Sequence, residues 1–581
     1  MRKIIVVSVI IALAVSAGAY YYFYQPFSRQ TAIEAVLPGD TFGMVRVCEL
    51  KKQIERFRTG RMGQALSGID LSQLMAAMEV TPERRIEVTQ AMEHFKSTID
   101  SPWFDSLFGR DVSLALLNVN FNPQQLESGD LQTLLDAVVV VARPKQPTRV
   151  LESLNSMFDS QLSVQTQDYQ QWEISRFSLE NGRSVYYALT NGLMIAALSI
   201  TPVKRCLEQS LDVTTSILQA QVYQRHCAGL YKTGRTDLLA FANAGHFLVF
   251  LREAFSHKAE NDPDMSLLMS RLESLQGIES INLVQYDDGS PLVRSKMIVG
   301  IDRTNMSHGL TRATAIAPGA NHTLKHVPVD ALLYSWQNIF DLKLCWHEIQ
   351  QHPEMTLETV AQIKQSFVMK TGMEIESLLE ALGTQAGLLV NDINMDGMFP
   401  IPELALFIEV RQPDVIDQLI KQQIKQFNMP VQHEAYRGTD IQYVTLPAGA
   451  NLSPAYTFSE EFCVLAINST LLKTMLDAPD TDHLGTHPSF KALGEGMTAD
   501  NNQVFYLRTD VLLAKARELI SLGMSMQAMT RSDEIEKTRK IVELGINPLL
   551  DGLSMVKAIG GRTYTDGNSI SSNIQVLLDR S

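Results

Sequence analysis

The sequence predicts an α+β fold: two tandem copies of one unit, each a mostly antiparallel sheet with packed helices, after an N-terminal transmembrane helix. Three observations predict it. An apolar run opens the chain, several strand-and-helix motifs occur twice, and each copy ends on two apolar runs joined by an Asp-Gly turn. The 581 residues, of which 45% are hydrophobic and 20% charged, have the composition of a globular chain with more than one domain.

The first element is the uncharged run Ile4–Tyr24, which follows Arg2 and Lys3. About 20 apolar residues span a bilayer as a helix, and flanking basic residues stay on the cytoplasmic side. We therefore expect residues 1–24 to anchor the chain in a membrane, with the body on the far side. The alternative is a cleaved signal peptide, because Ala17–Ala19 is an acceptable cleavage site.

The body that follows contains an internal repeat. "AVLPGDTFGMVRV" (Ala35–Val47) parallels "KHVPVDALLYSWQN" (Lys325–Asn338), and each predicts a turn that leads into a short strand. Further along the chain, other pairs of segments match in the same order: 103–119 with 375–392, 136–154 with 403–420, 185–209 with 455–478, 222–230 with 489–497, and 238–255 with 504–520. Each copy should close on a hairpin, with turns at Asp288-Gly289 and Asp566-Gly567.

These matches predict a first repeat at 33–303, a linker at 304–323 and a second repeat at 324–581. Within the first repeat, the spacing of Leu50, Ile54 and Phe57 predicts a helix over Leu50–Leu66.

One loop in the second repeat satisfies the calcium pattern D-x-N-x-D-G-x5-E, with Asp392, Asn394, Asp396 and Glu403 as candidate oxygen ligands. An EF-hand needs flanking helices. Here apolar strands flank the loop, and Pro402 opposes an exit helix. The sequence therefore favours a solvated hairpin turn with no metal, and calcium is the alternative ligand.

Charge and motifs exclude several functions. The formal net charge of −14 argues against binding to nucleic acid, since phosphate recognition needs clustered Lys and Arg. No nucleophile elbow, phosphate loop or dinucleotide fingerprint occurs, so we expect no enzyme activity and no cofactor. The five cysteines do not have the spacing of metal ligands. Cys206 and Cys227 either form a disulfide after export or are two buried thiols.

Two methionine-bearing segments offer an adaptable apolar surface. Met524, Met526 and Met529 lie in the second copy, and Met265 and Met269 occupy a similar place in the first. Core packing is the simpler interpretation of most of these residues.

The motifs "LPGDT", "LFGRDVSLAL", a strand ending in "ARP", and "NGLMIAALS" together resemble an uncharacterised, domain-of-unknown-function family of bacterial membrane-anchored exported proteins. This resemblance implies a single-pass protein of the bacterial inner membrane with its body in the periplasm. It brings no catalytic residues to this chain.

From these observations we expect a non-enzymatic, membrane-anchored periplasmic binding or scaffold protein. Its partners would be the inner membrane, through residues 4–24, and an unknown envelope protein or apolar ligand. Two alternatives stay open: a carrier of lipids or other apolar ligands that uses the methionine-bearing helices, and a hydrolase with a non-standard site.

Overall fold

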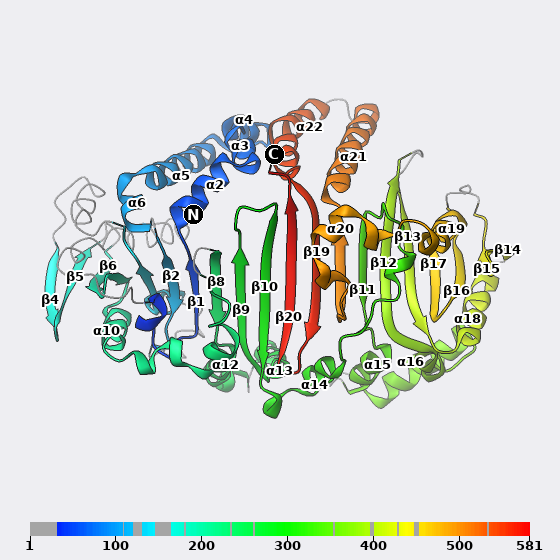
Figure 1. The fold of residues 1–581 in the computed structure, drawn as a ribbon, viewed down its shortest axis with the longest axis horizontal. Coiled ribbons are helices and arrows are strands. Elements are labelled where there is room, and N and C mark those ends of the chain that lie inside the picture. Colours follow the sequence, from blue (N-terminus) through cyan, green and yellow to red (C-terminus); the bar gives the residue numbers. More distant parts are fainter. Residues whose placement is uncertain are drawn as a thin grey trace. The chain divides into compact units, whose positions relative to one another are not determined.

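The structure is a computed structural model that describes residues 32–580 apart from gaps at 109, 120–130, 146–163, 179–181, 233–234, 260–261, 352–354, 396–399, 427–428, 447–451 and 531–533. The chain forms two compact units (Figure 1). Unit 1 comprises the described residues up to 312 together with 527–555 and 567–571. Unit 2 comprises 313–526, 556–566 and 572–580.

Unit 1 contains an antiparallel sheet in the order β4-β5-β6-β7-β3-β2-β1-β8-β9-β10. Its strands are β1 (Gly43–Val47), β2 (Val112–Leu116), β3 (Val138–Ala142), β4 (Gln165–Tyr169), β5 (Trp172–Ser178), β6 (Ser184–Thr190), β7 (Leu193–Ala197), β8 (Thr236–Ala242), β9 (Ile278–Tyr286) and β10 (Leu292–Ile301).

Unit 2 repeats this order as β14-β15-β16-β17-β13-β12-β11-β18-β19-β20, again with antiparallel neighbours. Its strands are β11 (Leu333–Gln337), β12 (Leu382–Asn394), β13 (Ile401–Val410), β14 (Gln432–Tyr436), β15 (Thr439–Tyr443), β16 (Ala455–Ser459), β17 (Phe462–Ala466), β18 (Gln503–Leu507), β19 (Val556–Thr565) and β20 (Ser569–Leu578), the last with its first residues in unit 1.

The two sheets also correspond residue by residue. The amide of Cys48 donates to the carbonyl of Asp237 at 2.9 Å, and the amide of Asn338 donates to that of Asn502 at the same distance. A T-shaped ring pair joins Tyr223 to Phe241 in unit 1, with centroids 5.2 Å apart, and the pair Phe490–Tyr506 stands at the matching place in unit 2. The internal repeat therefore appears in both strand order and register.

Helices complete both units. Those of unit 1 are α2 (Leu50–Thr59), α3 (Arg61–Ser67), α4 (Leu71–Ala77), α5 (Pro82–Asp100), α6 (Pro102–Phe108), α8 (Leu131–Asp136), α10 (Ile200–Gln209), α11 (Gln221–His226), α12 (Ala244–Ala259), α13 (Pro263–Ser274), α22 (Ile535–Ile541) and α23 (Asn547–Leu553). Those of unit 2 are α15 (Leu342–Gln351), α16 (Leu357–Thr371), α17 (Ile375–Ala381), α18 (Pro413–Gln426), α19 (Ser469–Asp477), α20 (Pro488–Ala492) and most of α21 (Thr509–Thr530), while α14 (His308–Ala315) lies at the division between the units.

Two helices from the second half of the sequence pack in unit 1. The helix α22 packs against α4, near which Figure 1 labels it, and α23 packs against α3. Glycines allow the close approach: a Cβ at Gly552 would lie 2.9 Å from Met62 Sδ, and a Cβ at Gly545 would lie 2.9 Å from a methyl group of Leu74. The predicted second repeat, 324–581, is therefore not itself a compact unit, because residues 527–555 belong to unit 1.

The main core of unit 1 lies on one face of its sheet. The 3-10 turn η1 (Ile33–Val36), α10 and α11 cover this face, and they bury residues such as Met44, Val139 and Phe241. A second cluster lies on the opposite face, where Phe104, Leu107 and Phe108 of α6 cover β3 and β7. Among the described helices, α10 and α11 pack on the first face, and α6, with Leu50 and Ile54 of α2, packs on the second.

The predicted fold class needs a correction. Within the described residues, none of the helices has the length and apolar character needed to cross a membrane. The predicted anchor, Ile4–Tyr24, lies outside the described residues. An α+β architecture rich in antiparallel sheet fits the structure. The predicted transmembrane helix and the predicted single-pass inner-membrane localisation are wrong, because no described element provides such a span.

The helix predicted over Leu50–Leu66 begins at Leu50 but is split into α2 and α3. Gly60 ends α2 with an extended backbone, φ −72° and ψ 160°, and the chain turns there. A Cβ at Gly63 would lie 2.0 Å from the carbonyl oxygen of Phe57. The glycines thus permit a tight corner that the apolar periodicity alone does not reveal.

Candidate functional site

The candidate site is a region of the unit 1 sheet that we call the open face. Direct cross-strand partners point to the same side of a sheet, so the register defines three rows across β2, β1, β8, β9 and β10. The rows are Val112–Val47–Leu238–Gln285–Ser295, Leu114–Val45–Ala240–Leu283–Met297 and Leu116–Gly43–Ala242–Ile281–Val299.

Large aliphatic side chains on this face are unusually exposed. The exposed fractions are 41% for Val45, 43% for Leu114, 42% for Ile281, 37% for Leu283 and 39% for Met297. None of the three rows contains a charged residue. The open face is therefore a continuous apolar surface rather than a set of scattered hydrophobic residues.

Some of the inward residues between these positions are polar, which is unusual for a half-buried strand. An antiparallel sheet normally turns its polar residues to solvent and its aliphatic residues inward. Here Arg46, Ser113 and Asn282 are turned inward and are at most 5% exposed, while their neighbours Val45, Leu114 and Leu283 point outward. Register fixes this choice, because a slip of one residue would exchange the two sets.

Arg46 is held on the inward side by two acids and a tyrosine. Its Nη1 lies 2.8 Å from Glu34 Oε1 and 3.1 Å from Glu34 Oε2. Its Nη2 donates to Asp111 Oδ2 and, at 3.1 Å, to the hydroxyl of Tyr231. The guanidinium also lies 4.2 Å from the centre of the Tyr231 ring. A buried cation needs this degree of pairing, since an uncompensated one is costly.

Burial by itself lowers the pKa of Arg46, but the carboxylates of Glu34 and Asp111 outweigh it and raise the pKa overall. Burial also raises the pKa of the neighbouring Cys48 thiol to about 12. The network therefore contains a fixed cation and an inert thiol. In unit 2, Trp336 replaces Arg46, and its indole N–H donates to Gln385 at 3.2 Å.

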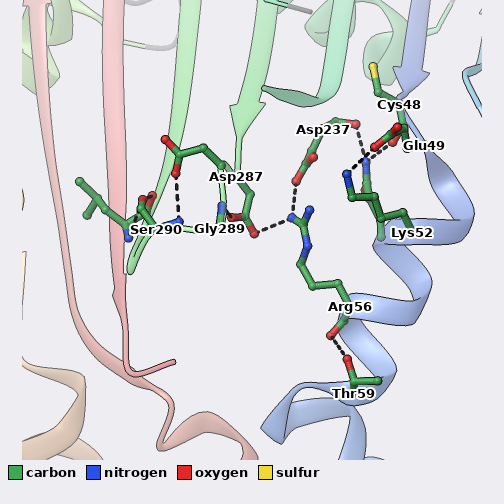
Figure 2. A network of polar contacts seen from close by, with 12 residues as sticks. Cys48, Glu49, Lys52, Arg56, Thr59, Asp237, Asp287, Gly289 and Ser290 are labelled. Atoms are coloured by element: carbon green, nitrogen blue, oxygen red, sulfur yellow. Dashed lines mark hydrogen bonds and ion pairs between the residues drawn. The ribbon is translucent and has the colours of Figure 1, made fainter. Parts of the chain in front are cut away.

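A second polar network ties α2 to the sheet beside the open face (Figure 2). Arg56 Nη1 lies 3.1 Å from Asp237 Oδ2 and 2.8 Å from Asp287 Oδ2, and Asp287 also accepts a hydrogen bond from the amide of Gly289 at 3.0 Å. Burial raises the pKa of Asp237, and Arg56 partly offsets that effect. Arg56 thus connects the α2 helix to β8 and to the β9–β10 turn.

The predicted calcium loop joins β12 to β13, so the predicted strand–loop–strand arrangement is confirmed. Asp392 and Asn394 end the first strand, and Glu403 lies early in the second. Asp396 lies outside the described residues.

The described candidates have partners of their own. Lys515 Nζ lies 3.2 Å from Asp392 Oδ1 and donates to the carbonyl of Ile393 at 3.1 Å. Glu403 accepts a hydrogen bond from Asn391 at 2.9 Å. An ammonium group thus already balances one of the proposed ligands. Across the described ranges no cluster of three or more His, Cys, Asp or Glu side chains suits a metal ion.

A serine, a histidine and a glutamate approach one another in unit 1, but their contacts do not suit nucleophilic catalysis. His226 Nε2 faces Glu279 Oε2 at 3.3 Å, and Arg225 also binds Glu279, at 2.6 Å. The hydroxyl of Ser280 accepts a hydrogen bond from Asn282 and is fully buried. The imidazole nitrogen that a serine would need is therefore engaged by the acid.

The two interpretations of Cys206 and Cys227 are now resolved: all five cysteines are free, and these two are buried. Among the predicted methionines, Met526 is 43% and Met529 87% exposed on α21. Neither the five cysteines nor these two methionines lie on the open face.

Sequence reasoning missed the open face and the Arg46 network. The available signal was in "GMVRV", "VSLAL" and "INLV", where aliphatic residues occur at the positions that alternate with Arg46, Ser113 and Asn282. Without the pairing register, these strands give no indication of which set is buried. No family model, curated protein or solved structure was found to match the chain, so the resemblance to exported bacterial proteins stays a prediction.

Proposed function

We propose that this chain is a non-enzymatic binding protein that receives an apolar partner on the open face of unit 1. The observation that supports this most directly is the alignment of Val45, Leu114, Leu283 and Met297, all more than a third exposed, in one row of the sheet. A contiguous apolar patch on a folded protein is typical of an interaction surface.

The free energy available on this face favours binding. Apolar surface removed from water contributes about 25 cal/mol per Å², and a fully buried leucine contributes about 1.5–3 kcal/mol. Leu114 and Leu283 stand on strands held rigidly by their neighbours and by the main core behind them. A partner therefore meets a preformed surface, and little conformational entropy is lost on that side.

A carrier that encloses a lipid has less support. A ligand-binding cavity usually buries most of its ligand. In the described residues, the pocket beside His326 and Phe407 in unit 2 has a cavity volume of about 10 Å³, which is room for one water molecule. A hydrolase has less support as well, because Ser280 is buried and His226 is engaged by Glu279.

The test is photo-crosslinking in cells of the source organism. A photoreactive amino acid replaces Leu283 on the open face, or Leu211, which is 59% exposed and follows α10 on the other side of the sheet. We expect a defined protein adduct from position 283 that is absent from position 211. Adducts of lipid mass alone would favour the carrier, and equal or no crosslinking from the two positions would contradict the proposal.

A further inference from the structure

We infer that the helix α2 is a detachable strap at the border of the open face, and that Arg56 is the latch that holds it on the sheet. This inference rests on the proposed function and names a way in which the same surface is regulated. It starts from the contacts that α2 makes with the rest of unit 1.

The helix α2 lies on the same side of the sheet as the open face. Its residues Leu50 and Ile54 pack against the cluster under α6, and so does Val112. Val112 is the first residue of the row Val112–Val47–Leu238–Gln285–Ser295. This end of the open face is therefore covered next to α2, and its exposure depends on α2 staying in place.

Polar contacts account for much of the attachment of α2. None of its ten residues is buried, whereas α6 buries three of its seven. Gln53 Nε2 donates to the carbonyl oxygens of Cys48 at 2.5 Å and Asp237 at 2.7 Å. Lys51 Nζ donates to the carbonyl of Ile99 at 3.1 Å. An element with so few buried apolar contacts separates from a fold at a lower free-energy cost than its core does.

Arg56 adds an ionic contact between α2 and the sheet (Figure 2). Its Nη1 lies 3.1 Å from Asp237 Oδ2 and 2.8 Å from Asp287 Oδ2. The two aspartate side chains are only 17% and 11% exposed, so water replaces the guanidinium poorly. One cation thus balances two carboxylates, and the attachment of α2 depends strongly on a single side chain.

The two ends of α2 allow it to leave the sheet. Glu49, which precedes the helix, has a left-handed backbone with φ 48° and ψ 49°. Gly60, which follows it, is extended. A few non-helical residues at the ends of an element can absorb a change in its direction. The next helix, α3, is held separately by its packing against α23.

Unit 2 closes the same end of its sheet without an ionic latch. The pairing register puts Asn502 at the place of Asp237 and Thr565 at that of Asp287. Asn502 Oδ1 accepts a hydrogen bond from the Thr565 amide at 2.9 Å, and its Nδ2 donates to the carbonyl of Ile316 at 3.0 Å. The fold therefore does not require Arg56 and its two acids, which are a feature of unit 1.

Release of α2 would expose Leu50, Ile54 and Val112 together and enlarge the apolar surface at this end of the open face. A partner that contacts the enlarged surface would bind the released state more tightly and shift the chain toward it. The latch would then set the fraction of chains that are ready to bind.

The test of the latch is hydrogen exchange of the full chain, read by mass spectrometry. A detached helix of ten residues is marginal in water, so release appears as faster exchange of its amides. Arg56→Gln should accelerate exchange in residues 50–59 about tenfold or more and leave β1 and β8 unchanged. Arg58→Gln is the matched control: it removes the exposed ion pair of the same helix with Asp100, and exchange should change less than about threefold.

A second variant separates release from a general loosening of the sheet. Arg56→Gln leaves Asp237 and Asp287 facing each other, and their repulsion would strain β8. Arg56→Gln combined with Asp237→Asn and Asp287→Thr brings in the residue types of unit 2 and removes that repulsion. We expect the same acceleration in residues 50–59. Unchanged exchange there, or equal acceleration in α2 and β8, would contradict the strap.

Photo-crosslinking from position 283 connects the latch to the proposed function. We expect Arg56→Gln to raise the yield of the protein adduct about twofold or more, because more chains are in the released state. If α2 is released but the yield does not rise, the regulatory inference is wrong and the binding function stands. If position 283 gives no adduct with or without the latch, the binding function is wrong, and the regulation that rests on it falls too.

Discussion

Arg46 and Glu34 form an ion pair inside unit 1, with the arginine Nη1 2.8 Å and 3.1 Å from the two carboxylate oxygens. Both residues are at most 5% exposed. The pair lies directly behind the open face, since Arg46 is the inward neighbour of Val45. The corresponding residues of unit 2 are Trp336 and Leu324, so the fold itself does not require the charges.

Replacing Arg46 alone should destabilise unit 1 severely. Arg46→Met leaves the carboxylate of Glu34 buried without its cation, which costs about 3–5 kcal/mol. We expect the thermal midpoint of unit 1 to fall by about 5 °C or more. The double variant Arg46→Met with Glu34→Leu should recover part of this loss, since Asp111 still lacks its cation. A double variant as unstable as the single one would show that the ion pair itself, and not the unpaired acid, supplies the stability.

Gly552 should be essential for docking α23 onto α3. In Gly552→Val the new side chain would meet Met62 and Ala65, whose nearest atoms lie 2.9–3.0 Å from a Cβ at this position. We expect a loss of about 1–3 kcal/mol and faster hydrogen exchange in residues 535–553.

The control is Gly523→Ala in α21, where a Cβ meets nothing within 4 Å. It should stabilise the helix by up to about 1 kcal/mol. Unchanged exchange in 535–553 of the Gly552 variant would contradict the proposed tight contact.

His326 should make unit 2 less stable in mild acid. Burial lowers the pKa of its imidazole, although Glu460 partly opposes this effect. The unfolded chain then binds the proton more readily than the folded one. The contribution of the neutral His326 imidazole to stability is therefore fully present above the unfolded pKa of about 6.5. It is lost progressively as the pH falls below that value.

His326→Val introduces the residue that unit 1 has at the matching position, Val36. Thermal midpoints measured between pH 7 and pH 5 should fall less in this variant than in the parent chain. An equal fall in both would assign the acid sensitivity to other groups.

Lys515 should prevent calcium binding at Asp392. Its ammonium group lies 3.2 Å from the Asp392 carboxylate, where a cation ligated by that residue would compete with it. We expect millimolar calcium to leave the thermal midpoint unchanged in the parent chain, as measured by scanning fluorimetry. A calcium-dependent rise that disappears in Asp392→Asn would establish the site instead, and Lys515→Met tests whether removing the ammonium creates one.

Several elements could be predicted from the sequence because their signals are local. Asp288-Gly289 marks the β9–β10 turn, since Gly289 takes a φ of 81° that other residues avoid. Pro402 and the apolar runs around the calcium-like loop correctly indicated two strands. The helix break at Gly60 was missed, because the periodicity of Leu50, Ile54 and Phe57 ends before it.

By itself, the sequence determined the α+β class, the paired motifs that recur in both sheets and the turns that close them, because each depends on residues close together in the chain. Only the tertiary structure decided which side of β1 is buried, that Arg46 meets Glu34 and Asp111, and that residues 535–553 pack in unit 1. These features depend on strand register and on contacts between distant segments. A strand such as β1 alternates two nearly equivalent faces, and only its neighbours in space select the one that is covered.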